Sequence, residues 1–306
     1  MSGELPTTLG TPAVRSRRFI SATLLSDYWT LTKPEVNFLI LITTSVGFDL
    51  GCSNAGQQFS FFALFNVLLG TLLVASGTAT LNQYVERKFD AQMHRTARRP
   101  AAAGRLNPHA VLGFGIILSA AGTIYLAVST TMLASLLALL TLISYLFLYT
   151  PLKRRTPLCV LVGAFPGAMP PLIGWAAASG NLNIEAWLLY AIVFLWQFPH
   201  FMAIAWMYRE DYDRAGYLML PKGHTRVAFV ILQTMLPLLA LLPISVAQLP
   251  ARPAGSFYWA GSLLGLAFLY FGLDFAQQRS RGSARRLLAA SIMYLPLLFM
   301  LRIAFR

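Results

Sequence analysis

Residues Phe61 to Leu81 read FFALFNVLLGTLLVASGTATL, and Asn82 to Pro100 continue as NQYVERKFDAQMHRTARRP. The first stretch has no charged side chain, and at about 1.5 Å per residue it is long enough to cross a hydrocarbon core of about 30 Å as a helix. The second stretch holds two carboxylates, five Lys or Arg residues and one His. The pair predicts a helix that crosses a bilayer and ends in a polar segment at one membrane surface.

The composition of the whole chain supports a bilayer environment. Of its 306 residues, 57% are hydrophobic and 11% are charged, and the mean hydropathy is +0.61. So few charges cannot cover a water-soluble surface. The formal charge of +13 is typical of basic residues that mark the cytoplasmic side of a membrane protein, so nucleic acid is not an expected partner. Cys52 and Cys159 match no metal or disulfide spacing.

Nine apolar stretches are long enough to cross the membrane as helices. The sequence therefore predicts an all-α integral membrane protein, a bundle of nine transmembrane helices. The expected spans are 35–54, 59–81, 108–128, 130–149, 158–178, 184–208, 226–248, 256–276 and 285–304.

Basic residues predict the orientation of this bundle. With the N-terminus inside, all but three of the 24 Lys and Arg residues fall on the inner side, the exceptions being Arg252, Arg302 and Arg306. This bias indicates a cytoplasmic N-terminus and cytoplasmic long loops in a cell inner membrane, with the C-terminus outside.

The N-terminal 27 residues differ from the remainder of the chain. They lack the apolar core and cleavage site of a secretory signal. A mitochondrial presequence is the alternative, but Pro6 and Pro12 disfavour the amphipathic helix that it requires. We expect residues 1–27 to be a flexible cytoplasmic arm and residues 28–306 to form one transmembrane domain.

A row of polar residues follows the second predicted span. Asn82, Glu86 and Asp90 recur every four residues, so on a helix they share one face over roughly 12 Å. One Mg²⁺ ion needs oxygen ligands at about 2.0–2.1 Å and cannot touch all three. The row instead suits a diphosphate with one or more bridging ions, and Arg95, Arg98 and Arg99 would bind the remaining phosphate oxygens. The alternative interpretation of this row is a helix end that is exposed to solvent.

A second acidic cluster ends the sixth predicted span, in the stretch WQFPHFMAIAWMYREDYDRAG. It contains Glu210, Asp211 and Asp213, whose irregular spacing does not select a ligand. Four helices separate it from the first cluster, so a repeated four-helix unit would bring both clusters to one mouth of the bundle. A neutralised acid-base loop is the alternative.

Three further side chains have two readings each. Tyr149 and Lys153 lie four residues apart at the end of the fourth span, where Lys153 would neutralise a departing diphosphate beside the Tyr149 hydroxyl. Interfacial anchoring by an aromatic and a basic residue explains the same two residues.

His200 lies within an apolar span, where an ionisable side chain is costly. It would either contact a substrate or bond to a backbone carbonyl in helix packing.

Together these motifs resemble a known family. The stretches LTKPEV, NQYVERKFDAQMHRTARRP, YTPLKR, GAMPPLIGW, WQFPHF and REDYDRAGYLMLP run from about Lys33 to Pro221. The combination resembles the intramembrane prenyltransferases of the UbiA superfamily. YTPLKR, PPLIGW and WQFPHF with REDY resemble the branch that prenylates haem.

The resemblance implies a nine-helix bundle with Mg²⁺ and farnesyl diphosphate at its cytoplasmic mouth. It also implies farnesyl transfer to a vinyl group of haem B with addition of water, and partners in haem A synthesis or terminal-oxidase assembly. By position, the resemblance assigns metal binding to Glu86, Asp90, Asp211 and Glu210, substrate binding to Asn82, Arg95, Arg99 and His200, and catalysis to Tyr149, Lys153 and Asp211.

Two alternative functions stay open at this point. The first is a related prenyltransferase with another aromatic acceptor, such as a quinone or chlorophyll precursor. The second is a non-enzymatic transporter or assembly factor for haem or an anionic lipid. Transporters often carry charge at the membrane midplane, whereas the charge predicted here lies at one face.

Overall fold

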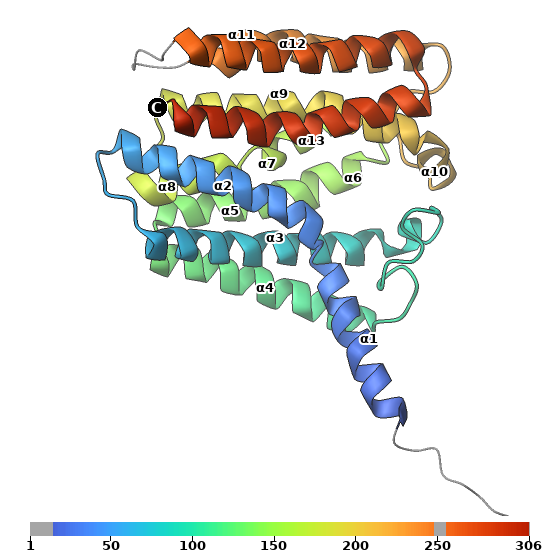
Figure 1. The fold of residues 1–306 in the computed structure, drawn as a ribbon. Coiled ribbons are helices and arrows are strands. Elements are labelled where there is room, and N and C mark those ends of the chain that lie inside the picture. Colours follow the sequence, from blue (N-terminus) through green and yellow to red (C-terminus); the bar gives the residue numbers. More distant parts are fainter. Residues whose placement is uncertain (1–14, 248–254, 306) are drawn as a thin grey trace, which may run out of the picture.

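The computed structural model describes residues 15–247 and 255–305, and the regular structure in these ranges is helical (Figure 1). Within them, nine segments are long and apolar enough to cross a membrane, which confirms the predicted architecture. The long single helices are α2 (Pro34–Asn54), α3 (Phe61–Asp90), α4 (Pro108–Ser129), α9 (Ile184–Met207), α11 (Thr225–Val246), α12 (Gly255–Gln278) and α13 (Arg281–Ala304).

The other two spans are each built from shorter helices. The fourth combines α5 (Met132–Ile143), the π-helical turn η1 (Ser144–Tyr149) and α6 (Thr150–Leu152). The fifth combines α7 (Cys159–Gly167) and α8 (Pro170–Ser179), which are separated just before two consecutive prolines that cannot continue the hydrogen-bond ladder. Single π-turns inside α-helices are frequent at functional sites, and η1 ends at a predicted site residue.

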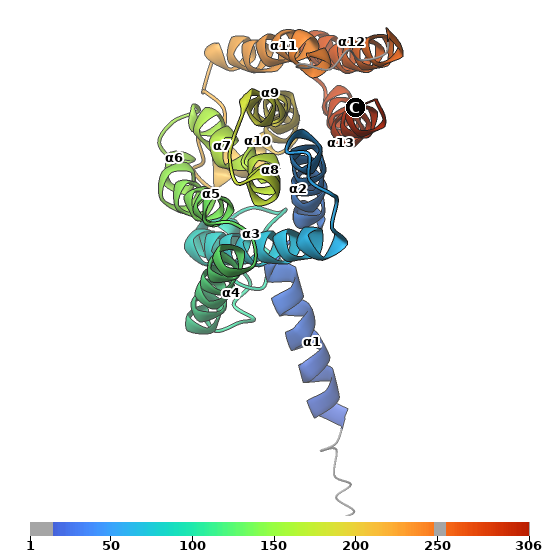
Figure 2. The ribbon, with the colours of Figure 1, turned by 90° about the vertical axis from the view of Figure 1, so that its left-hand side faces the viewer.

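The spans lie side by side, with α3 and α4 along one flank and α11 and α12 along the other (Figures 1 and 2). Helices α2, α8 and α9 lie between these flanks, and α13 packs on α9. A Cβ atom on Gly47 of α2 would lie 2.1 Å from the Pro171 carbonyl oxygen, and one on Gly174 of α8 would lie 2.0 Å from the Thr44 carbonyl oxygen. Glycine is therefore required where these two backbones touch.

Three boundaries differ from the sequence prediction. Helix α3 continues past Leu81 to Asp90, so the polar row extends the spanning helix itself. Helix α13 begins at Arg281, four residues earlier than expected. Helix α1 (Arg15–Leu31) makes the second half of the predicted flexible arm helical. Residues 1–14, Arg252 and Arg306 lie outside the described residues.

Helix α1 is fastened to the bundle at its C-terminal end. The Gln83 Nε2 atom donates to the Leu31 carbonyl at 3.0 Å, and Arg105 forms a bidentate ion pair with Asp27, with a shortest distance of 2.8 Å. The Tyr28 ring meets the Phe114 ring edge to face. These contacts explain why the boundary predicted at Asp27 falls within an ordered helix.

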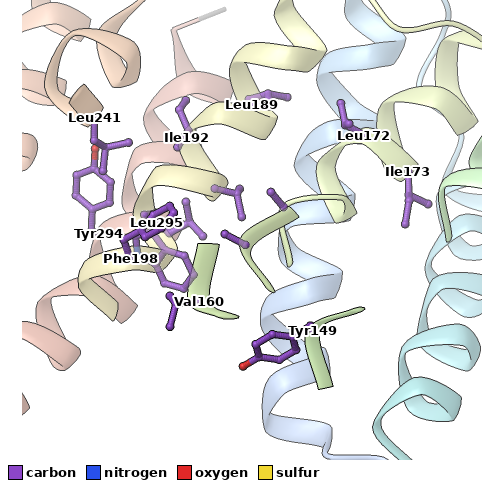
Figure 3. Packing of buried hydrophobic residues seen from close by; sticks show 14 of the residues in the cluster. Tyr149, Val160, Leu172, Ile173, Leu189, Ile192, Phe198, Leu241, Tyr294 and Leu295 are labelled. Carbon is purple, nitrogen blue, oxygen red and sulfur yellow. The ribbon is translucent and has the colours of Figure 1, made fainter. Parts of the chain in front are cut away.

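The segments that carry the two acidic clusters lie at the same end of the bundle. Figure 1 shows the loop after α3, helix α10 (Arg209–Arg214) and the start of α13 together at the right-hand end, with the C-terminal end of α13 at the opposite end. Figure 3 shows Tyr149 at the lower margin of the buried hydrophobic residues, with its hydroxyl directed away from Leu172 and Ile173.

Candidate active site

The last turns of α3 form one wall of the site. Asn82, Glu86 and Asp90 are buried, with exposed fractions of 1%, 5% and 1%. Two of the three are carboxylates, and burial of an uncompensated carboxylate is costly. Each member of the row is therefore paired with a cation that comes from a different segment of the chain.

Glu86 is paired with Lys153, which follows α6. The Lys153 Nζ atom lies 2.9 Å from Glu86 Oε1 and 3.2 Å from Oε2. Although burial disfavours the charge of Lys153, the Glu86 carboxylate raises the pKa of Lys153 well above its ordinary value. The ammonium also lies 4.6 Å from the centre of the Tyr149 ring and 5.9 Å from that of Tyr145. These rings form a cation-binding aromatic wall.

Asp90 is paired with Arg99 of the loop after α3, with Arg99 NH1 2.8 Å from Asp90 Oδ2. The Thr96 hydroxyl donates to the Asp90 carbonyl oxygen at 2.8 Å. These two bonds fold the loop back over the end of α3. The guanidinium of Arg99 is therefore held against the last turn of α3.

Lys33 completes the row at Asn82. Its Nζ atom donates to Asn82 Oδ1 at 3.3 Å. The residue before a proline seldom adopts the left-handed region, yet Lys33 has φ 52°. Such backbone strain costs about 1–3 kcal/mol and gathers at functional sites. Burial, together with the positive charges of Arg99 and Lys153, lowers the pKa of Lys33 to about 7.

The second acidic cluster reaches the first through Asp211 of α10. Asp211 is 8% exposed. Its Oδ2 atom accepts from the Arg95 backbone N–H at 3.3 Å, and its Oδ1 atom accepts from Arg214 NH1 at 3.0 Å. The Arg95 guanidinium lies over the Tyr208 ring at 4.8 Å and donates to the Tyr212 hydroxyl at 3.1 Å. The geometry thus places Asp211 against the loop that follows the first acidic cluster.

The structure does not bring two predicted site residues into this group. The Glu210 carboxylate is 62% exposed and faces Arg209 and Arg281. His200 lies between α9 and α13, where its Nδ1 atom is 2.8 Å from the Ser291 hydroxyl and its ring stacks on Trp196. This environment is that of a helix-packing histidine, although its partner is a hydroxyl instead of a backbone carbonyl.

The sequence analysis missed Lys33 and Tyr217 as site residues. Tyr217 is 3% exposed, and its hydroxyl faces the Glu86 carboxylate without completing a hydrogen bond to any described residue. Burial and the negative charge of Glu86 both raise the pKa of Tyr217. The sequence does contain a feature that could have indicated Lys33, because this lysine lies immediately before the first predicted span. Tyr217 has none beyond its place in the stretch after the second acidic cluster.

The donor atoms of this site fit Mg²⁺. Glu86, Asp90 and Asp211 offer carboxylate oxygens, and Asn82 adds an amide oxygen. Hard oxygen ligands of this kind suit Mg²⁺, which usually takes one or two carboxylates and completes its shell with substrate phosphates and water. Among the described residues, no three Asp, Glu, His or Cys side chains are close enough to hold an ion alone. A substrate that brings its own oxygens is therefore part of the expected shell.

Comparison with known proteins identifies the family of this chain. A model of the UbiA prenyltransferase family matches residues 40–300. The chain belongs to this family, and it is a multi-pass membrane prenyltransferase.

Within the family, its similarity is to protoheme IX farnesyltransferases. The protein of that name from Solibacter usitatus is 46% identical over 282 residues, which cover 90% of this chain and 97% of that protein. The mitochondrial protein of that name from Arabidopsis thaliana is 38% identical over 275 residues, which cover 88% of this chain and 62% of that protein.

Solved structures share the fold. A UbiA homologue from Aeropyrum pernix matches with a TM-score of 0.63 at 19% identity, over 86% of this chain and 98% of that one. A UbiA homologue from Archaeoglobus fulgidus, solved with GPP and Mg²⁺, matches with a TM-score of 0.62 at 15% identity, over 90% and 99%. The prediction of a UbiA-type bundle, made from motifs alone, is confirmed.

Proposed function

We propose that the chain transfers the farnesyl group of farnesyl diphosphate to a vinyl side chain of haem B and adds water, giving haem O and diphosphate. The relatives' names support this acceptor. The observation that carries the reaction type is the row of buried carboxylates paired with cations, above all Glu86 with Lys153 and Asp90 with Arg99. Transfer to another aromatic acceptor is the second candidate, since the same row would serve it.

The paired charges have a direct use in binding a metal diphosphate. Glu86, Asp90 and Asp211 would hold Mg²⁺, which neutralises phosphate charge when it is bound. The cations released from these carboxylates, Lys153 and Arg99, would then donate to phosphate oxygens. Lys33 would supply a third positive charge from the side of Asn82. In the free protein, the same ion pairs neutralise the buried charges.

The reaction itself breaks the bond between farnesyl C1 and the diphosphate oxygen. Lys153 and Arg99 stabilise the charge that grows on the departing oxygen. The allylic cation left behind is attacked by the terminal vinyl carbon of haem B, which forms the new carbon–carbon bond. The remaining cation, on the carbon next to the ring, takes the oxygen of water, and one proton leaves. The Tyr145 and Tyr149 rings beside Lys153 offer π-faces that favour cations at this end of the bundle.

We infer the orientation from the distribution of charge, and we expect the membrane to be a cell inner membrane. Because the site lies at the end of the bundle that holds the long basic loops, we place it at the cytoplasmic face of the inner membrane. Delivery of the product to a haem A synthase or to terminal-oxidase assembly is part of the same proposal.

The experiment that tests the function compares two acceptors. Purified protein is incubated with farnesyl diphosphate and Mg²⁺, and with either haem B or 4-hydroxybenzoate, and products are identified by mass spectrometry. We expect a farnesylated, hydrated haem and no farnesylated benzoate. Product from the benzoate alone would support a quinone-type enzyme. Haem binding without product from either acceptor would support a transporter.

A further inference from the structure

A polar cavity, here called the basic pocket, lies beside Asp211 of the proposed diphosphate site. Its volume is about 410 Å³, and residues from the loop after α3, the junction of α9 and α10, and the first turns of α13 line it. The polar and charged residues among them are His94, Tyr208, Glu210, Asp211, Arg214, Arg281 and Arg285. Three guanidinium groups face two carboxylates, so the lining is positive even with His94 neutral.

The guanidinium groups of this basic pocket are only weakly engaged. Within the described chain, exposed Arg285 makes no hydrogen bond or ion pair. Arg281 meets Glu210 at 3.3 Å, but both side chains are more than half exposed, and such surface pairs contribute little. Arg214 is 45% exposed and shares Asp211 with Arg95. The pocket therefore has positive charge available for an anion.

Membrane orientation alone does not explain this arrangement. The positive-inside tendency accounts for arginines near the start of α13, but the helix dipole disfavours cations at a helix N-terminus. Arg286 in the same turn is held away by Asp274 at 2.7 Å and by Gln278 at 3.3 Å. Arg281 and Arg285 instead converge with Arg214 on one cavity.

The basic pocket adjoins the proposed diphosphate site, because Tyr208 and Asp211 line the pocket and both contact Arg95. Tyr208 lines the pocket, and the Arg95 guanidinium lies 4.8 Å from the centre of the Tyr208 ring. Asp211 borders the pocket and bonds to the Arg95 backbone. A ligand held by Arg281 and Arg285 would therefore lie beside Arg95 and Asp211, the residues of the proposed diphosphate site that border the pocket.

We propose that the basic pocket binds the two propionate carboxylates of the haem acceptor. This inference rests on the proposed function. Haem B carries its vinyl groups on one half of the macrocycle and its propionates on the other half. A vinyl group at the transfer site therefore leaves the two carboxylates on the opposite side of the macrocycle. Guanidinium groups bind carboxylates in a bidentate manner. A volume of about 410 Å³ is at the small end of ligand pockets, which suits the carboxylate edge better than a whole tetrapyrrole.

The test compares the double variant Arg281→Gln/Arg285→Gln with the control Arg286→Gln, whose side chain points away from the pocket. Binding of haem B and of haem B dimethyl ester, which lacks free carboxylates, is titrated by absorbance in detergent. The KM for each acceptor and for farnesyl diphosphate is then measured. We expect the double variant to weaken haem B binding and raise its KM by about tenfold or more. The dimethyl ester should bind wild type and double variant alike.

Each outcome decides a different question. Unchanged haem B binding in the double variant, or an equal loss for the dimethyl ester, overturns the propionate assignment. A raised KM for farnesyl diphosphate with unchanged haem B binding would mean that the pocket holds phosphate, and also overturns it. If wild type binds haem B but forms no product, the proposed function fails, while the binding titration still tests the pocket. Matching elution profiles and thermal stability of the three proteins establish that the double variant is folded.

Discussion

The Lys153 ammonium lies 2.9 Å from the Glu86 carboxylate, and their side chains are only 12% and 7% exposed. The pair joins the end of α3 to the end of α6, two segments that are 67 residues apart. In the proposed reaction, the Glu86 carboxylate binds the metal and the Lys153 ammonium binds the departing diphosphate. Structural and catalytic contributions of the pair are therefore separable by mutation.

We predict that Lys153→Met lowers kcat by about 10²–10³-fold, because it removes a donor aimed at charge that develops in the transition state. It also leaves Glu86 buried without its partner, which destabilises the protein by about 3–5 kcal/mol if the carboxylate stays ionised. The double variant Glu86→Gln/Lys153→Met should regain most of that stability and none of the activity. Thermal unfolding in detergent and product formation measure the two effects. Recovery of activity in the double variant would show that Lys153 serves the fold alone.

Lys33 should give the KM for farnesyl diphosphate a pH dependence. With a pKa of about 7, Lys33 is charged in the free protein below that pH and loses its proton above it. Diphosphate binding favours the charged form, so above the pKa the substrate must also recruit a proton, and KM rises by up to about tenfold per pH unit. Lys33→Arg stays charged and should flatten this rise, while Lys33→Met should bind weakly throughout. Identical pH profiles for wild type and Lys33→Arg would contradict the role.

Tyr149 depends on a glycine of α7. A Cβ atom on Gly163 would lie 2.6 Å from two carbon atoms of the Tyr149 ring, so Gly163→Ala must displace that ring from Lys153. We expect kcat to fall by about ten- to a hundredfold, as for other small misplacements of catalytic groups. Gly113→Ala is the matched control, since a Cβ atom there meets no atom within 4 Å. Equal activity of both variants would remove Tyr149 from the mechanism.

The Tyr217 hydroxyl is buried without a hydrogen bond to any described residue, and removing such a group should not destabilise the fold. If it donates to bound diphosphate or to metal-bound water, Tyr217→Phe lowers kcat/KM by about tenfold while leaving the melting temperature equal or higher. Loss of stability with unchanged kcat/KM would mean that the hydroxyl serves packing alone. Steady-state kinetics and thermal unfolding on the same preparation distinguish the two results.

The nine spans and the polar row were predictable because hydrophobic length and a four-residue repeat are local properties of the chain. Asn82, Glu86 and Asp90 share a face of α3 because the helix continues through them, although its end was placed at Leu81. The continuation has a physical reason, since each polar side chain is paired with Lys33, Lys153 or Arg99. Such pairing stabilises a polar helical extension that hydropathy alone would end.

The choice between Glu210 and Asp211 was not predictable from spacing. It depends on the fold of α10 against the loop after α3, which directs Asp211 toward the Arg95 backbone and Glu210 toward Arg281. The partner of His200 likewise depends on the packing of α13 on α9. Both are contacts between segments distant in sequence, and no local pattern reports them.

In the proposed reaction, the carboxylates of α3 bind the metal and the facing cations bind the phosphate oxygens of the same metal diphosphate. Equilibrium binding of farnesyl thiodiphosphate, an unreactive analogue, tests this assignment most directly when measured for wild type and Asp90→Asn with Mg²⁺ or with a chelator. We predict that wild type binds at least about tenfold more tightly with Mg²⁺ than with chelator, and that Asp90→Asn loses this gain while keeping its fold. Equal binding by wild type in the two conditions, or an undiminished Mg²⁺ effect in Asp90→Asn, would contradict the account.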